Sequence, residues 1–393
     1  MKKSIIFSLT LFIFIMSSCL KGKMDKGAEG PIIIAYVGGY NGLVDVDKIS
    51  ANKITHINYA FADVQNGKAF LTNEVTDTVN FRKLNELKLQ NPDLKILISI
   101  GGWGWSRNFS DAVLTPEKQQ VFAKSAVEIM NKYNLDGVDI DWEYPAIEGD
   151  VGNIFRPQDK ENYTLMFAAI RNELNALEKT TDKKYLLTTA VGGFQKFIEN
   201  TQISEAQQYL DYINIMTYDS QSKEKAIHHT NLLVSDKYSP SNSAESAVNG
   251  YVAAGVPVEK LVMGIAFYGR MYKVKGGSSK GLGDPIVEQI EGKGYTYIKD
   301  SLVNKNEYYR YWDESAQAPY LYNFYKGIFV TYDDEESVKA KCLYAKEKGM
   351  AGVMFWEYSL KIINLNVVRS SYYASVCVFG KRLVFIDEEV NIK

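Results

Sequence analysis

Eight short apolar runs recur along the chain of 393 residues, and the stretches between them have the spacing of amphipathic helices. Each run is almost continuously apolar, which is typical of parallel strands that are covered by helices. The runs occupy residues 32–40, 54–62, 94–102, 135–145, 185–193, 210–219, 261–270 and 350–358. Eight strands that alternate with helices predict an α/β protein with a (β/α)8 TIM barrel.

Two of the intervening helices have clear signals. In residues 115–134, Thr115 suits the N-cap and Pro116 suits the first helical position. Residues 161–178 show the same helical spacing of apolar side chains. An open doubly wound sheet is the alternative fold. It usually carries a glycine-rich phosphate turn after its first strand, and "VGGYNG" at residues 37–42 does not fit G-x-G-x-x-G.

The connection between the seventh and eighth runs is too long for a loop. About sixty residues rich in Tyr, Gly and Lys lie there, and structureless loops of that length are rare in compact domains. We therefore expect a small α+β insertion domain at residues 271–331, with the barrel formed by residues 31–270 and 332–365. The tail, residues 366–393, has strand-like runs where a closing helix is expected. An unusual extension and a disturbed reading frame both remain open for it.

The N-terminus has the pattern of an export signal. Lys2 and Lys3 precede apolar residues 5–16, and small residues lead to Cys19. The apolar run is short for a membrane span, and "MSSC" resembles a loose bacterial lipobox. We expect a signal peptide over residues 1–19, lipidation of Cys19 and a tether over residues 20–30, so that the exported protein is anchored in the bacterial cell envelope. Plain secretion is the alternative.

Composition narrows the possible partners. The net charge of −2, without a basic patch, argues against nucleic acid. The 27 Tyr, 18 Phe and 5 Trp suit sugar binding as well as a packed core. Cys342 and Cys377 form no cluster with zinc spacing, so we predict no metal and no cofactor, and Cys342 should be a buried free thiol. We expect a monomer.

The fourth run, "LDGVDIDWEYP", places acids at alternate positions. Asp139, Asp141 and Glu143 should share one face of a strand, roughly 6–7 Å apart at each step, while the apolar residues between them face the covering helices. In a barrel the acidic face is the interior. Asp136 has the other parity and is interpreted as a structural residue at the start of the strand.

Three interpretations of these acids compete. In a purely structural role, burial of these carboxylates would lower the stability of the fold by several kcal/mol each, and no function would offset that loss. A calcium loop needs Gly at its sixth position and Glu at its twelfth, and counting from Asp139 these positions hold Tyr144 and Asp150. Acid–base chemistry fits better, because carboxyls this close cannot all ionise freely. Glu143 would lie at the strand end where barrel enzymes place their chemistry, and it is the candidate acid.

The pattern D-x-x-D-x-D-x-E resembles the fourth-strand motif of the glycoside hydrolase family 18 chitinases. Further motifs extend the resemblance over residues 31–360: "SIGGW" at 99–103, "MTYD" at 216–219, "YGR" at 268–270, and Trp356 on the eighth strand. The insert resembles the chitinase insertion domain.

The resemblance implies retaining cleavage of β-1,4-linked N-acetylglucosamine polymers, chitin or chitooligosaccharides. The substrate's own acetamido group would be the nucleophile, and an oxazolinium ion the intermediate. Glu143 would protonate the glycosidic oxygen, and Asp141 would orient the acetamido N–H. Asp139, helped by Ser99, would hold a proton with Asp141, and Tyr218 would donate to the acetamido carbonyl.

The resemblance also implies a set of sugar-binding residues at the strand ends: Tyr36, Phe61, Trp103, Met216, Asp219, Tyr268, Arg270 and Trp356. Trp356 would form the floor and Trp103 would stack on a neighbouring sugar. Phe61 and Met216 also suit ordinary core packing.

Two other functions stay open. One is an endo-β-N-acetylglucosaminidase that cuts the chitobiose core of N-glycans, and the insert together with "DWEYP" favours a chitinase over it. The other is a chitinase-like lectin that binds without cutting. The presence of Glu143, Asp141 and Tyr218 argues against the lectin.

Overall fold

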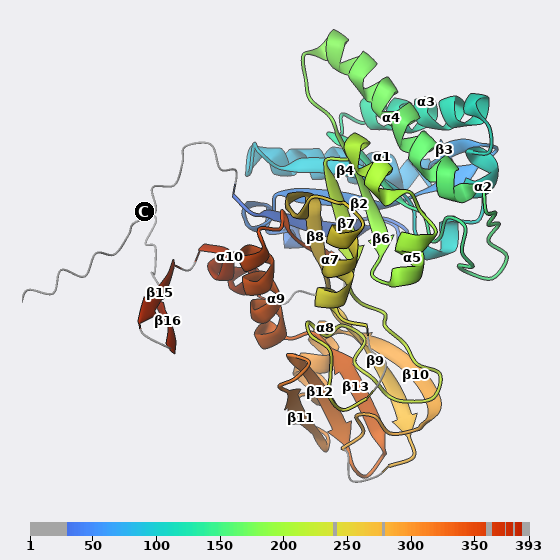
Figure 1. The fold of residues 1–393 in the computed structure, drawn as a ribbon. Coiled ribbons are helices and arrows are strands. Elements are labelled where there is room, and N and C mark those ends of the chain that lie inside the picture. The colour runs from blue at the N-terminus through green and yellow to red at the C-terminus, as the bar shows by residue number, and fades with distance from the viewer. Residues whose placement is uncertain are drawn as a thin grey trace, which may run out of the picture. The chain divides into compact units, whose positions relative to one another are not determined.

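The computed structural model describes residues 30–238, 242–276, 280–358, 364–373, 375–379 and 382–386 (Figure 1). Pro31–Tyr373 form one compact unit, and Met1–Gly30 with Ala374–Lys393 form a second. The predicted signal peptide, Cys19 and most of the predicted tether lie outside the described residues. Over the described part of the chain, no helix combines the length and the apolar character needed to cross a bilayer.

Eight parallel strands form a closed barrel, which confirms the predicted fold. They are β1 (Ile32–Gly38), β2 (His56–Gln65), β4 (Lys95–Gly101), β5 (Gly137–Asp141), β6 (Leu186–Gly192), β7 (Tyr212–Met216), β8 (Leu261–Ala266) and β14 (Gly352–Trp356). Strand β1 pairs with both β2 and β14, and this closes the sheet. A short strand, β3 (Lys68–Phe70), adds an antiparallel hairpin to β2.

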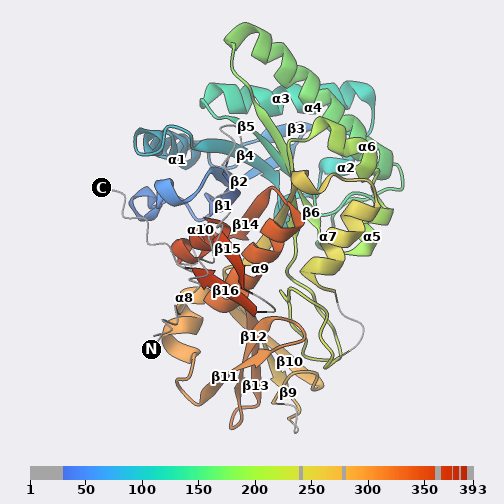
Figure 2. The same ribbon diagram turned by 60° about the vertical axis from the view of Figure 1, so that its left-hand side comes forward.

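The helices lie around the outside of the barrel (Figure 2). They are α1 (Glu74–Glu86), α2 (Phe109–Ala112), α3 (Pro116–Lys132), α4 (Asp159–Thr181), α5 (Gln195–Glu199), α6 (Ile203–Ala206), α7 (Ala244–Ala253), α9 (Glu335–Lys348) and α10 (Leu365–Tyr373). Both predicted helices are confirmed as α3 and α4. The Thr115 side chain accepts a hydrogen bond from the Lys118 N–H at 3.4 Å, as its N-cap role predicts.

The barrel wall has an apolar core on each side. The apolar residues of β5 are fully buried against the helices, as predicted, and Trp142 just beyond the strand stacks on Phe109 of α2 with ring centroids 5.1 Å apart. A separate, smaller cluster that includes Ile34 and Met354 fills the barrel interior. The strands are therefore buried on both faces, which explains why their runs are almost continuously apolar.

The predicted insertion domain lies between β8 and β14. It is a five-stranded antiparallel sheet in the order β10-β9-β13-β12-β11. Its strands are β9 (Tyr268–Val274), β10 (Ile286–Gly294), β11 (Tyr308–Asp313), β12 (Ala318–Asn323) and β13 (Ile328–Tyr332). One helical segment, α8 (Tyr295–Tyr297) with the π-helical turn Ile298–Leu302, completes it. Figure 1 shows this sheet beyond the end of the barrel, below α7 and α9.

Two strand predictions were too long. Strand β5 ends at Asp141, so Glu143 lies in the turn beyond the strand. The run 261–270 is two strands, because the backbone of Phe267 leaves the barrel after its N–H bonds to the Trp356 carbonyl at 2.8 Å. Tyr268 and Arg270, expected on the seventh barrel strand, lie instead on β9 of the insertion sheet.

The tail contains a helix that the sequence did not predict. Helix α10 packs Leu365 and Val368 into the same apolar core as Cys342 of α9. Cys342 is a buried free thiol, as predicted. In the second unit, β15 (Ser375–Phe379) and β16 (Arg382–Ile386) form an antiparallel hairpin, in agreement with the strand-like pattern there.

Candidate active site

The predicted acids gather at the C-terminal end of the barrel. Asp139 is fully buried among the strands, whereas Asp141 and Glu143 line a cavity of about 460 Å³. Asp136 points elsewhere: its carboxylate binds Lys88 at 2.6 Å, Lys183 at 3.0 Å and the Ile96 N–H at 2.8 Å. These contacts fit the structural role expected for Asp136.

Asp139 is held by donors from four other strands. Tyr36 donates to its Oδ2 at 2.9 Å and Ser99 at 2.7 Å; Thr188 donates to Oδ1 at 2.5 Å and Asn214 at 3.3 Å. Burial raises the pKa of Asp139, and the donated hydrogen bonds oppose that rise. Ser99 therefore contacts Asp139 and fixes it in place, but its hydrogen bond favours the charged form of Asp139 and does not help it to hold a proton.

Asp141 is held much less tightly. Its Oδ1 is buried without a hydrogen-bond partner, and within the described residues no hydrogen bond joins it to Asp139. Burial raises the pKa of Asp141 well above its ordinary value, and the neighbouring Glu143 and Asp139 raise it further. The Asp141 carboxyl therefore favours its protonated form and has the freedom to turn.

The turn after β5 carries Glu143 into the cavity. The Ser106 hydroxyl accepts from the Glu143 N–H at 2.9 Å and lies 3.2 Å from the Asp141 carbonyl, to which it donates. Gly101 has a φ of +112°, and a Cβ there would lie 2.1 Å from the same carbonyl. A side chain at Gly101 would displace this turn, which explains the glycine of "SIGGW".

Glu143 has the pKa that an acid–base group needs. Burial raises the pKa of Glu143 to about 7, the negative charge of Asp219 adds to the rise, and a hydrogen bond with Tyr144 opposes it. A carboxyl with a pKa near neutrality is able both to donate and to accept a proton.

The cavity brings together all eight residues predicted to bind sugar. They are Tyr36, Phe61, Trp103, Met216, Asp219, Tyr268, Arg270 and Trp356. Sequence reasoning missed five further lining side chains: Tyr40, Trp105, Tyr144, Ala190 and Gln221. Three of these are aromatic, which was the only signal that the sequence offered for them.

Aromatic rings form one wall of the cavity. Trp356 stacks nearly parallel on Phe61, with centroids 5.4 Å apart, and Tyr40 is parallel to Trp356 at 6.4 Å. Trp103 is 51% exposed, which is unusual for a tryptophan and leaves its ring free for a ligand. Flat apolar faces of this kind suit the faces of sugar rings.

Another wall of the cavity is polar. Oδ1 of Asp219 accepts from the Tyr268 hydroxyl and from Nε of Arg270, both at 2.6 Å. Burial raises the pKa of Tyr218 well above its ordinary value, and Asp141 adds to this, so the Tyr218 hydroxyl keeps its proton. Strand β9 of the insertion domain thus supplies two of the four polar side chains.

The described residues contain no group of three or more His, Cys, Asp or Glu side chains suited to holding a metal ion. The polar groups of the cavity are carboxyls, phenols, a guanidinium and the amide of Gln221. This set is suited to proton transfer and to binding hydroxyl and amide groups.

A closed parallel barrel with a near-neutral acid at its C-terminal end, inside an aromatic cavity, is typical of barrel glycoside hydrolases. The chain belongs to glycosyl hydrolases family 18, whose family model matches residues 32–360.

Named relatives agree with this membership. Chitinase A1 of Niallia circulans is 36% identical over 90% of this chain, which spans 60% of that relative's length. A family 18 N-acetylglucosaminidase from Paenibacillus barengoltzii superposes with a TM-score of 0.80 at 37% identity, covering 87% of this chain and 99% of that one. Chitinase ChiA74 from Bacillus thuringiensis superposes with a TM-score of 0.82 at 31% identity, covering 91% and 75%.

Proposed function

We propose that this protein is a retaining glycoside hydrolase that cleaves β-1,4-linked N-acetylglucosamine polymers, namely chitin or chitooligosaccharides. The observation that carries the proposal is Glu143, whose pKa is about 7, placed in an aromatic cavity above the Asp141–Asp139 pair. The relatives named as chitinases support the same substrate class.

In the first step, the acetamido carbonyl oxygen of the substrate attacks the anomeric carbon of its own sugar. The glycosidic C–O bond breaks as Glu143 gives its proton to the leaving oxygen, and a cyclic oxazolinium ion forms. The proton that Asp141 shares with Asp139 stays on Asp139 as Asp141 turns. The charged Asp141 carboxylate then accepts the acetamido N–H, and its negative charge stabilises the cation. Tyr218, which keeps its proton, donates to the acetamido carbonyl and holds it in line for attack.

In the second step, the Glu143 carboxylate takes a proton from water, and the water oxygen attacks the anomeric carbon. The oxazolinium ring opens, the acetamido group is restored, and Glu143 is protonated again. Two inversions at one carbon retain its configuration. Asp139, fixed by four donors, provides a constant partner beneath Asp141 while Asp141 changes its contacts.

The proposal is tested by product analysis with the purified mature protein. One reaction contains chitotetraose and the other a high-mannose glycoprotein, and mass spectrometry identifies the products. Chitobiose or N-acetylglucosamine from chitotetraose alone is the expected result, and the ratio of the two separates a chitinase from an N-acetylglucosaminidase.

Two other results would contradict the proposal. A released glycan that carries a single N-acetylglucosamine would show an endo-β-N-acetylglucosaminidase. Binding of chitotetraose without any product would show a lectin.

For the exported protein, the N-terminal pattern supports lipidation of Cys19 and a place in the bacterial cell envelope, with release into the medium as the alternative. The domain would then meet its polymeric substrate outside the cytoplasm, where chitin fragments occur.

A further inference from the structure

Two adjacent histidines in the segment after β7 are completely buried and have different partners. His228 and His229 have exposures of 1% and 0%. Each lies near one carboxylate: His228 near Asp313 of the insertion sheet, and His229 near Asp219 of the cavity. His229 therefore lies on the cavity side, and His228, which lies away from the cavity, is available as a matched control.

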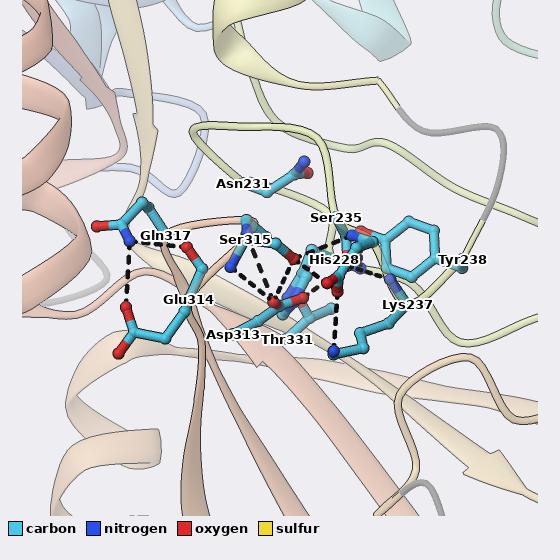
Figure 3. Close-up of polar contacts among 12 residues, drawn as sticks. His228, Asn231, Ser235, Lys237, Tyr238, Asp313, Glu314, Ser315, Gln317 and Thr331 are labelled. Carbon is cyan, nitrogen blue, oxygen red and sulfur yellow. Dashed lines mark hydrogen bonds and ion pairs between the residues drawn. The ribbon is translucent and has the colours of Figure 1, made fainter.

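His228 belongs to a structural cluster (Figure 3). Its Nε2 lies 3.2 Å from Oδ2 of Asp313, which also accepts from the Ser235 hydroxyl at 2.6 Å. The Ser315 hydroxyl donates to the other oxygen at 2.7 Å. None of these residues lines the cavity, so the cluster fastens the segment after β7 to the turn between β11 and β12.

His229 faces the polar wall of the cavity. Its Nδ1 lies 3.5 Å from Oδ1 of Asp219, and its ring packs against that of Tyr268 at 5.3 Å. Its backbone N–H donates to the Thr331 hydroxyl at 3.0 Å, and its carbonyl accepts from the Ser220 N–H at 3.1 Å. These backbone contacts fix the position of the ring relative to Asp219.

Among the described residues, neither ring nitrogen of His229 makes a hydrogen bond, and the 3.5 Å approach to Asp219 is a contact at ion-pair distance. The Asp219 carboxylate is the acceptor nearest to Nδ1, so the proton of a neutral His229 belongs on Nδ1. A contact of 3.5 Å is long for a hydrogen bond, but such contacts at catalytic sites often tighten when substrate binds.

The charges around this contact favour a neutral histidine and an ionised aspartate. Burial lowers the pKa of His229, although the nearby Asp219 opposes this. Burial alone would raise the pKa of Asp219, but the nearby His229 ring, the hydrogen bond from Arg270 and the charge of Arg270 hold that pKa well below its ordinary value. Arg270 and Asp333 are the other charged groups near His229: the charge of Arg270 lowers the pKa of His229 further, and that of Asp333 opposes this.

Resting on the proposed hydrolase function, we propose that His229 is a positioning residue: its Nδ1–H holds the charged Asp219 carboxylate in the cavity beside Glu143. Tyr268 and Arg270 contact the same oxygen from β9, whereas His229 reaches it from the segment after β7. Asp219 has a φ of 62°, in the left-handed region, and its side chain is 40% exposed, so it needs fixed donors to stay in one orientation.

The proposed role of His229 predicts the direction in which the pH profile of kcat/KM shifts when the contact is lost. The Asp219 charge raises the pKa of Glu143, whose other charged or titratable neighbours are Asp141, Tyr144 and Tyr218. If Asp219 loses the His229 contact and rotates on its bonds to Tyr268 and Arg270, so that its charge moves away from Glu143, the pKa of Glu143 falls. The acid form of Glu143 is then lost at a lower pH, so the alkaline limb of kcat/KM moves to lower pH.

The two amide substitutions of histidine separate the two ring nitrogens. Asn places its NH₂ near the position of Nδ1, and Gln places it near that of Nε2. His229→Asn therefore keeps the donor to Asp219, whereas His229→Gln moves it away. The partner of His228 is bound through Nε2, so His228→Gln and His228→Asn are matched controls with the opposite preference.

The experiment measures kcat/KM against pH with a chitooligosaccharide for the wild type and these four variants. We expect the alkaline limb of His229→Gln to lie about half a pH unit lower than that of the wild type, and that of His229→Asn to be unchanged. Both His228 variants should keep the wild-type limb, whatever they do to thermal stability. Asp219→Asn, which removes the charge itself, should lower the limb at least as far as His229→Gln.

An unchanged limb in His229→Gln would overturn the inference, and so would an equal shift in His229→Asn. If the His229 variants do not fold, an unchanged limb in Asp219→Asn would overturn it instead. Absence of turnover by the wild type would overturn the proposed function together with this inference, so the two failures are distinguishable.

Discussion

Glu143 is the residue on which the proposed chemistry depends. We predict that Glu143→Gln lowers kcat at least about a thousandfold, since the amide has no proton to give to the leaving oxygen. Binding of chitotetraose should stay within about threefold, because the amide keeps the shape of the carboxyl. Steady-state kinetics and calorimetry measure the two effects.

Glu148 provides the matched control, because it lies in the same segment after β5 but is exposed. Glu148→Gln should retain wild-type kcat. Hydrolysis by Glu143→Gln at the wild-type rate would rule out Glu143 as the acid.

The raised pKa of Glu143 also makes a prediction about stability. The folded protein keeps a proton on Glu143 up to a pKa of about 7, whereas the unfolded chain loses it near the ordinary value of 4.5. Between these values the folded state binds more protons, so this group's contribution to stability falls as pH rises. Glu143→Gln removes the effect, so its melting temperature should exceed that of the wild type by a few degrees at about pH 8 and by less at about pH 5.

Thermal denaturation at several pH values checks this expectation, again with Glu148→Gln as the control. A difference in melting temperature that shrinks as pH rises would show that Glu143 is not an acid with a raised pKa.

The residues of the site were predictable where a motif contained them or where they fell at the end of a predicted barrel strand. Asp139, Asp141, Glu143 and Tyr218 were named from short motifs, as were most of the lining residues. Tyr36 and Phe61 were named from their places at strand ends. Thr188 and Asn214, which fix Asp139, look like ordinary polar residues within strands and gave no signal. Tyr40 lies in a turn and Trp105 in the short 3-10 helix Trp103–Trp105, and their approach to Trp356 and Phe61 depends on the three-dimensional path of the chain.

At the scale of elements, the strand and helix pattern could be predicted because parallel strands are buried on both faces and therefore stand out as apolar runs. The ends of strands could not. The run "LVMGIAFYGR" stays apolar across Phe267, although the chain changes sheets there. Helix α10 was missed because its apolar residues form the face that is buried against α9. In the sequence alone, where α9 is not seen to cover them, the same residues are equally compatible with a strand.

Helix α9 is joined to the barrel by a buried ion pair. Nζ of Lys341 lies 2.6 and 2.9 Å from the two oxygens of Asp333 and 2.7 Å from the Thr230 hydroxyl, and Lys341 is fully buried. Asp333 also accepts from the Ala266 N–H at the end of β8. We predict that Lys341→Met lowers the free energy of unfolding by about 3–5 kcal/mol, because it leaves the Asp333 charge buried and unpaired.

Chemical denaturation measures this loss, and a double variant separates its causes. Adding Asp333→Asn to Lys341→Met removes the unpaired charge, so the double variant should be more stable than Lys341→Met alone. If the two substitutions simply add their losses, the ion pair is not the source of the effect.

At the scale of the whole molecule, the N-terminal signal predicts where the protein works. We predict that Cys19→Ala shifts the protein from the membrane fraction to the soluble fraction of the producing bacterium, since the acyl chains have no other attachment site in the motif. Fractionation with immunodetection measures the shift, with Ser18→Ala as the control. Equal distribution of wild type and Cys19→Ala would indicate plain secretion.

The boundary of the compact unit also predicts which part of the tail the barrel needs. Pro31–Tyr373 form one unit that includes α10, whose Leu365 and Val368 are buried, while β15 and β16 belong to the second unit. A chain that ends at Tyr373 should therefore keep its melting temperature within about two degrees and its activity within about twofold. A chain that ends before α10, at Ile363, should lose about 3 kcal/mol or more, because it exposes the core around Cys342.

Thermal denaturation and turnover of a chitooligosaccharide compare the two truncations with the full chain. Equal stability of both truncated chains would show that α10 adds nothing to the barrel. Loss of folding in the chain that ends at Tyr373 would show instead that the barrel depends on the β15–β16 segment. Residues 374–393 would then be needed for the barrel to fold, although they belong to the second compact unit of the structure.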